Sequence, residues 1–220
     1  MRSEVRRADE RYLTVGDGVR TRHSFSYGAH YDPANVGLGP LVAINEEQVE
    51  PGGGYDAHAH ADVEVVTWVL EGALAHADTT GQAGTIRPGT AQRLSAGTGA
   101  EHAERNASST EPLRFVQTML RSQHEQAPEY AAVDVPDGPG LHEAVTVHAD
   151  AVLLVARPTS AATVVVEGAP QVLVHVTRGR VDVAGAALGP GDELRATDVS
   201  PGLALRGNGE ALVWRLIDPA

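Results

Sequence analysis

The sequence predicts an all-β protein built from antiparallel barrels or sandwiches. Short segments rich in β-branched residues are separated by turn residues every 8–12 positions. Gly 24 and Pro 13 together make up about a sixth of the 220 residues, which suits many tight turns. No long segment shows the 3.6-residue period of an amphipathic helix, so we expect little helix.

Composition excludes several classes of function. Hydrophobic residues are 42% and charged residues 21% of the chain, as in an ordinary soluble globular protein of one large or two small domains. A formal net charge of -12 argues against direct binding of nucleic acid or of an anionic membrane surface, but it leaves room for a protein partner. The chain has no cysteine, so neither a disulfide nor a thiolate metal site can form.

The N-terminal segment, residues 1–10, is charged and no apolar run follows it. It therefore has the features of neither a signal peptide nor a membrane span, and we expect a cytoplasmic protein.

The first half of the chain contains a regular series of short strand signals. Residues 1–22 are polar and rich in arginine, and we expect an opening strand and a loop there. Val63–Leu70 is the clearest strand, because it is rich in β-branched residues and apolar on both faces. The other expected strands are His23–Tyr27, Leu41–Ile44, Ala73–Asp78, Thr85–Arg87, Gln92–Leu94 and Leu113–Leu120.

The second half of the chain shows a similar series of strand signals after a segment that lacks them. Residues 122–149 contain scattered prolines, glycines and acidic residues with little periodicity, which is typical of a linker. Beyond it we expect strands at Val152–Ala156, Thr163–Val166, Val172–Thr177, Leu203–Arg206 and Leu212–Ile217.

A faint internal repeat supports two barrels in tandem. The segment from Leu70 to Gly89 has a weaker counterpart from Thr177 to Asp192, but the second half has no histidines at the matching positions. We therefore predict an N-terminal barrel with a metal site, a linker, and a C-terminal barrel without metal ligands, at 1–121, 122–149 and 150–220.

Histidines at alternate positions are the main functional signal. His58 and His60 would project from the same face of one strand, and His102 and Glu104 repeat that spacing further along. Two such strands facing each other across a barrel would bring together four ligands for a divalent transition metal. A lone pair of this kind is weak evidence, since about half a match per chain is expected by chance.

The surroundings of these residues strengthen the signal. Both segments resemble the two conserved motifs of the cupin superfamily, with one extra residue before Gly72 and with Gly97 where the usual motif has proline. The matching positions are Gly52, His58, His60, Glu64 and Gly72 in the first segment, and Gly97, Gly99, His102 and Asn106 in the second.

Short sequence motifs within about residues 20–120 resemble those of one cupin family, the pirins. The second half resembles pirins only in its general β pattern, and Ala59 replaces a proline that pirins usually carry between the paired histidines. The matching stretches are His23-Ser-Phe-Ser, Tyr31-Asp-Pro, His58-Ala-His-Ala-Asp-Val-Glu64, Trp68-Val-Leu-Glu-Gly72, His76-Ala-Asp, Arg87-Pro-Gly89, Ser95-Ala-Gly-Thr-Gly99 and His102-Ala-Glu104.

This resemblance implies two tandem cupin (antiparallel jelly-roll) barrels with one mononuclear metal site in the first. The implied ligands are His58, His60, His102 and Glu104. Glu64 fits the ligand position of the general cupin motif, but in pirins the carboxylate comes from the later segment, so we predict a structural or outer role for Glu64. His23 matches the opening motif without an assigned role. The remaining single histidines are expected to be ordinary surface or core residues: His76, His124, His142, His148 and His175.

Three imidazoles and a carboxylate suit one divalent transition metal. Fe²⁺ is favoured, and Ni²⁺, Mn²⁺, Co²⁺, Cu²⁺ and Zn²⁺ are alternatives. Such an ion could bind a small aromatic or enediol substrate through two oxygens and lower the pKa of its hydroxyl groups, and Glu104 could accept the proton as general base. The electron-rich chelate could then react with O₂.

The pirin resemblance implies a quercetin 2,3-dioxygenase type of reaction, in which a flavonol such as quercetin is opened with loss of carbon monoxide. It equally implies an alternative, an iron-dependent, redox-responsive regulator that binds a transcription factor or a metabolic enzyme. A third possibility is a barrel that holds a metal without catalysis.

Overall fold

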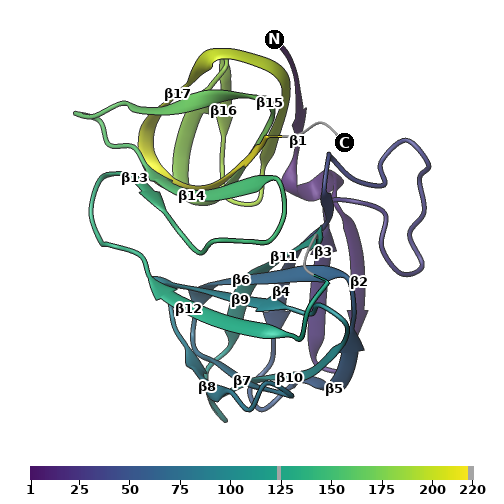
Figure 1. Ribbon diagram of the computed structural model, residues 1–220. Helices are drawn as coiled ribbons and strands as arrows, with labels where there is room; N and C mark the ends of the chain where they lie inside the picture. The colour runs from purple at the N-terminus through teal and green to yellow at the C-terminus, as the bar shows by residue number, and fades with distance from the viewer. Residues whose placement is uncertain (123–124, 218–220) are drawn as a thin grey trace. The chain divides into compact units, whose positions relative to one another are not determined.

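The computed structural model describes residues 1–122 and 125–217, which are almost entirely strand (Figure 1). The described residues contain a single 3₁₀ helix, η1 (Ala8–Glu10), so the predicted all-β class is confirmed. The chain forms two compact units. One comprises Tyr12–Asp134 and Val147–Ala149, and the other comprises Met1–Arg11, Val135–Thr146 and Asp150–Ala220.

The first unit contains two antiparallel sheets, which Figure 1 shows as two layers. The larger sheet has the strand order β12-β9-β6-β11-β4-β3-β2 and the smaller has the order β5-β10-β7-β8. The strands of the larger sheet are β2 (Tyr12–Gly16), β3 (Val19–His23), β4 (Leu41–Val49), β6 (Val63–Glu71), β9 (Thr90–Ser95), β11 (Leu113–Arg121) and β12 (Glu129–Asp134). Those of the smaller are β5 (Gly54–His60), β7 (Leu74–Asp78), β8 (Ala83–Ile86) and β10 (Ala100–Asn106).

Two separate apolar clusters fill this unit, because alternate residues of each strand point inward. One cluster contains Val49, Val69 and Phe115, and the other contains Val65 and Met119. The same strands contribute to both clusters, so polar side chains at the positions between them occupy the middle of the interior. That polar middle is where the predicted site residues lie.

The second unit is a six-stranded sheet of β1 (Arg2–Arg6), β13 (Gly140–Glu143), β14 (Ala151–Arg157), β15 (Val164–Val183), β16 (Ala186–Leu188) and β17 (Glu193–Leu216). Its core is a single apolar cluster rich in valine and leucine. The strands expected at Val172–Thr177 and Leu212–Ile217 are parts of the long strands β15 and β17, which continue through glycines. At Gly207 (φ +115°) a Cβ would collide with the carbonyl oxygen of Arg180, so glycine lets the strand bend without ending.

Strand pairing assigns some segments differently from the sequence prediction. β1 pairs with β17, so residues 1–11 lie in the second unit, and β12 pairs with β9, so the first unit extends to Asp134. The segment 122–149, predicted as a linker, contains β12 and β13. The strand expected at His23–Tyr27 is instead β3, which ends at His23, because β3 pairs with β4 only up to the His23–Asn45 partners.

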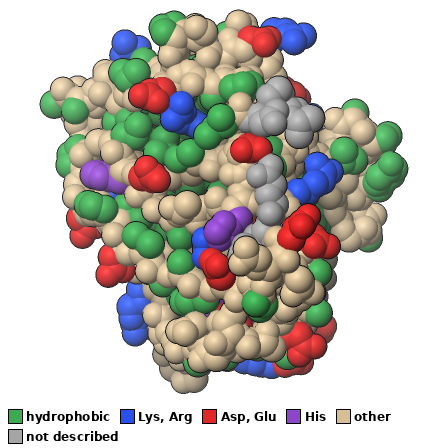
Figure 2. Space-filling model, in the orientation of Figure 1, with side chains coloured by type: hydrophobic (Ala, Val, Ile, Leu, Met, Phe, Trp, Pro, Cys, Tyr) green, Lys and Arg blue, Asp and Glu red, His purple; other side chains and the backbone are tan. Residues whose placement is uncertain are grey.

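Acidic and basic side chains are interspersed on the face seen in Figure 2, so the acidic residues form no continuous acidic patch on that face. Within the described ranges, no helix has the length and apolar character needed to cross a membrane.

Candidate metal centre

The paired histidines and His102 come from neighbouring strands. β5 and β10 pair antiparallel in the smaller sheet, and His58 is the direct cross-strand partner of His102. The expectation that these strands face each other across a barrel is therefore wrong. Cβ atoms of direct cross-strand partners lie about 4.5–5.5 Å apart, so adjacency alone is enough to bring the imidazoles together.

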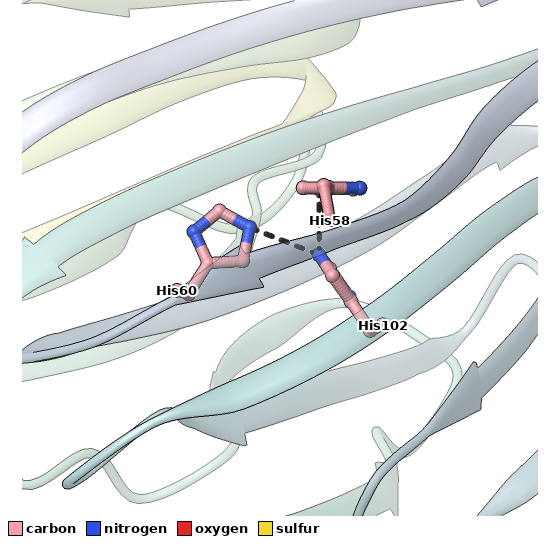
Figure 3. A group of neighbouring side chains, drawn as sticks. All are labelled: His58, His60 and His102. Carbon is pink, nitrogen blue, oxygen red and sulfur yellow. Dashed lines mark hydrogen bonds between the residues drawn. The ribbon is translucent and has the colours of Figure 1, made fainter.

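The three imidazoles point toward one another (Figure 3). His102 Nε2 lies 3.0 Å from His58 Nε2 and 3.0 Å from His60 Nε2. His102 is 1% exposed, whereas His58 and His60 are half-buried, so the cluster is closed behind His102 and open on the side of β5.

Hydrogen bonding and burial both suit these rings to metal binding. His58 Nδ1 donates to the backbone carbonyl of Asp56 at 2.8 Å, which fixes the tautomer with an unprotonated Nε2. Burial, reinforced by the nearby His58, lowers the pKa of His60 and lowers that of His102 to about 3. Both rings are therefore neutral at pH 7, which is the form that binds metals.

Glu104 follows His102 on the same inward face of β10, where both are buried. Its Oε2 atom lies 3.9 Å from His102 Nε2 and accepts a 2.7 Å hydrogen bond from Gln117 Nε2. Its Oε1 atom is buried and has no hydrogen-bond partner among the described residues. Burial raises the pKa of this carboxyl to about 7, although the hydrogen bond from Gln117 opposes that shift.

These residues fit a divalent metal ion. Two ligands about 2.1 Å from one ion and at right angles to each other are about 3.0 Å apart, the spacing of both nitrogen pairs. Three ring nitrogens that converge in this way can each offer a lone pair to a cation when the rings are neutral. The unpartnered Glu104 Oε1 is a fourth available donor atom.

A second group of potential ligands contains His76, His102 and Glu104. The sequence prediction treated His76 as an isolated, ordinary histidine, but its ring lies 5.5 Å from that of His102. Both of its nitrogens are engaged, Nε2 with Asp78 Oδ2 at 2.7 Å and Nδ1 with Gln92 Nε2 at 2.9 Å. His76 therefore has no free lone pair and lies behind His102 as a packed neighbour. The spacing His76-Ala-Asp78 is the only sequence signal that could have indicated this pair.

Three further residues were considered as site candidates from the sequence: Glu64, His23 and His124. Glu64 is fully buried and accepts hydrogen bonds from Ser95 (2.7 Å) and Ser122 (2.5 Å), away from the imidazoles. His23 lies in the wall of the same cavity as His58 and His60, although its motif did not indicate this. His124 lies outside the described residues.

A row of polar side chains crosses the larger sheet opposite these ligands. Direct strand partners run from Gln92 to Thr67, then to Gln117, Asn45 and His23. All five are buried, and together they form a polar belt between the two apolar clusters. Four of these residues carry no signal of a site in the sequence, since only the strand register brings them into line: Gln92, Thr67, Gln117 and Asn45.

A cavity of about 330 Å³ opens beside the imidazoles, within the size range of small-molecule sites. Its wall includes a second buried carboxylate, that of Glu47, which accepts hydrogen bonds from Thr21 Oγ1 (2.5 Å) and Tyr55 Oη (2.9 Å). The lining residues are Thr14, Thr21, His23, Tyr27, Gly28, Ala29, Asn45, Glu47, Tyr55, His58, His60, Glu104, Gln117 and Met119.

Fold and site together define a cupin-type protein with a His₃Glu cluster open to a cavity. The family model described as Pirin matches residues 5–120, and the chain belongs to the pirin family.

Individual relatives agree with this membership. The chain is 41% identical over 230 residues to "Putative quercetin 2,3-dioxygenase Rv0181c" of Mycobacterium tuberculosis, covering 97% of this chain and 94% of that protein. It is 39% identical over 116 residues to quercetin 2,3-dioxygenase of Escherichia coli, covering 53% of this chain and 50% of that protein. The solved structure of the bacterial pirin YhhW from Escherichia coli, in complex with nickel(II), superposes with a TM-score of 0.92 at 28% identity, covering 98% of this chain and 99% of that one.

Proposed function

We propose that this protein is a metal-dependent dioxygenase that uses O₂ to open the heterocycle of a flavonol, such as quercetin, or of a related enediol, with release of carbon monoxide. The observation that carries the proposal is the convergence of three imidazole Nε2 atoms, 3.0 Å apart in two pairs, beside a cavity that also contains Glu104. The names of the relatives support the same substrate class.

His58, His60, His102 and Glu104 would hold the ion. Fe²⁺ is our proposal for its identity, and the nickel(II) bound by the relative from Escherichia coli supports a divalent ion of this group. The chemistry that such an ion supplies when bound is Lewis acidity, which lowers the pKa of coordinated hydroxyl groups.

The protein's own residues position the substrate and move its proton. Gln117 orients Glu104 by a hydrogen bond to Oε2, and we assign Glu104 as the general base that would accept a substrate hydroxyl proton on partly leaving the ion. His76, fixed by Asp78 and Gln92, packs against the His102 ring and limits its movement. Burial of His102 and Glu104 excludes water from the closed side of the site.

Oxygen uptake with quercetin tests the proposal, using protein loaded separately with Fe²⁺ or Ni²⁺ and metal-free protein as control. We expect metal-dependent consumption of O₂ and release of carbon monoxide. Absence of turnover in every metal form, with a partner protein captured in only one oxidation state of iron, would favour the regulatory alternative. A cytoplasmic location and the absence of nucleic-acid and membrane partners remain predictions from the sequence.

A further inference from the structure

The cavity beside the imidazoles has a distinctive charge pattern that the proposed reaction does not use. Two buried carboxylates, Glu47 and Glu104, line it, and among its described lining residues none is Lys or Arg. Away from the proposed metal ligands, Glu47 disfavours a substrate group that carries a carboxylate or a phosphate there, because like charges in a poorly solvated site repel strongly. It favours a neutral ligand that donates hydrogen bonds.

Thr21 and Tyr55 both donate hydrogen bonds to Glu47 in this wall. Thr21, its direct partner on β3, donates at 2.5 Å, and Tyr55 donates at 2.9 Å, both to the Oε2 atom. These bonds hold the carboxylate in one orientation at the cavity. Glu47 also lines the cavity, so a hydroxyl group of a ligand inside it can reach this carboxylate, which when ionised acts only as an acceptor.

Flat rings line the cavity near this carboxylate. The rings of His23 and Tyr27 stack with centroids 5.0 Å apart, and Tyr55 meets His58 edge to face at 6.1 Å. All four residues are part of the wall. Aromatic walls favour planar aromatic ligands, which stack on them or meet them edge to face.

We propose that Glu47, held by Thr21 and Tyr55, is a specificity-determining residue that accepts a hydrogen bond from a peripheral hydroxyl group of a neutral, planar, polyhydroxylated aromatic substrate. This inference rests on the proposed function, since it takes the cavity as the substrate site. It assigns to Glu47 the recognition of hydroxyl groups outside the reacting part of the molecule.

The test compares Glu47→Gln with Glu46→Gln in anaerobic binding titrations on metal-loaded protein. Glu46 precedes Glu47 on β4, where its side chain points to the other face of the sheet and pairs with Arg114 at 2.7 Å. The two probes are quercetin and 3-hydroxyflavone, which keeps the reacting hydroxyl and keto groups and lacks the peripheral hydroxyl groups. Metal content is measured for each variant.

We expect Glu47→Gln to raise the Kd for quercetin about tenfold and to change the Kd for 3-hydroxyflavone far less, as expected for loss of a charged acceptor. Tyr55→Phe should act in the same direction by a smaller factor, and Glu46→Gln should match the parent protein. Equal weakening of both flavonols, or unchanged quercetin binding with full metal content, would overturn the assignment.

The anaerobic titration and the separate oxygen-uptake assay together distinguish the two proposals. If the parent protein binds quercetin and consumes no O₂, the dioxygenase proposal fails while the Glu47 assignment is still decided by the Kd ratio. If the metal-loaded parent protein binds neither flavonol, the assignment of Glu47 fails as well.

Discussion

Gly54 is the position at which a single methyl group should damage both the fold and the site. It lies on β5 with φ +144°, as the direct cross-strand partner of Arg105 and next to the pair of Tyr55 with Glu104. A Cβ there would lie 2.6 Å from the Cα of Arg105 and would collide with the carbonyl oxygen of Glu104. These obstacles are backbone atoms, so no side-chain rotation can relieve them.

The cost of Gly54→Ala has two parts. Positive φ in a residue with a Cβ costs about 1–2 kcal/mol, and forcing the neighbouring strand aside costs about 1–3 kcal/mol. The total of about 2–5 kcal/mol corresponds to a fall in Tm of about 5–15 °C for a chain of this size. Because the displaced atoms belong to Glu104, metal affinity should also fall by about tenfold or more.

Two other glycines provide matched controls in calorimetry and metal titration. Gly52 has φ +70° and nothing within 4 Å of the added Cβ, so Gly52→Ala should show the dihedral cost alone. Gly84 on β8 has open space and an ordinary φ, so Gly84→Ala should be close to neutral. If Gly54→Ala matched Gly84→Ala in Tm and the parent protein in metal affinity, the close approach of β5 and β10 would not set the site.

Three further predictions concern single side chains. His102→Ala should abolish metal binding, measured by elemental analysis, while circular dichroism shows the strand content retained, because the apolar clusters lie outside the site. Glu104→Gln should keep part of the metal and lose at least tenfold in the rate of O₂ uptake; unchanged turnover would remove Glu104 from the role of base. In the second unit, burial alone would raise the pKa of Glu193, but the hydrogen bond from His175 and the charge of Arg11 hold it at about 2, below its ordinary 4.5. Its stabilisation, about 3 kcal/mol, is thus complete above pH 4.5 and is lost as pH falls toward 2, so urea unfolding of Glu193→Gln should differ from the parent protein at pH 7 and converge with it in acid.

The local periodicity of the sequence predicted the fold class and the candidate ligands, because both depend on neighbours in the chain. Alternation in a strand puts His58 and His60 on one face, and His102 and Glu104 on another, without knowledge of which strands are adjacent. Their adjacency could not be predicted in the same way, since pairing of β5 with β10 joins segments more than forty residues apart. The pairing of Arg2–Arg6 with β17 joins segments that lie even further apart in the sequence.

The polar belt was invisible in the sequence for a related reason. Thr67, Gln117 and Asn45 lie in strands that also contain other polar residues, and a polar residue in a strand more often faces solvent than an interior. Only the register places them side by side. Glu47 was hidden further by the acidic segment around it, in which its neighbour Glu46 lies on the opposite face of the sheet.

The polar belt also shows how the site limits the core. Thr67 and Gln117 interrupt strands that could otherwise have joined the two apolar clusters into one, and buried polar groups lower stability unless each is hydrogen-bonded. Gln117 meets this condition by donating a hydrogen bond to Glu104. This bond orients the carboxylate and at the same time gives the buried amide of Gln117 an acceptor. Buried atoms without a partner among the described residues include His102 Nδ1, Glu104 Oε1 and Gln92 Oε1, which belong to the imidazole cluster, to the adjacent carboxylate and to the partner of His76. A barrel selected for stability alone would have apolar side chains at these positions, so the belt is the part of the interior that the site requires.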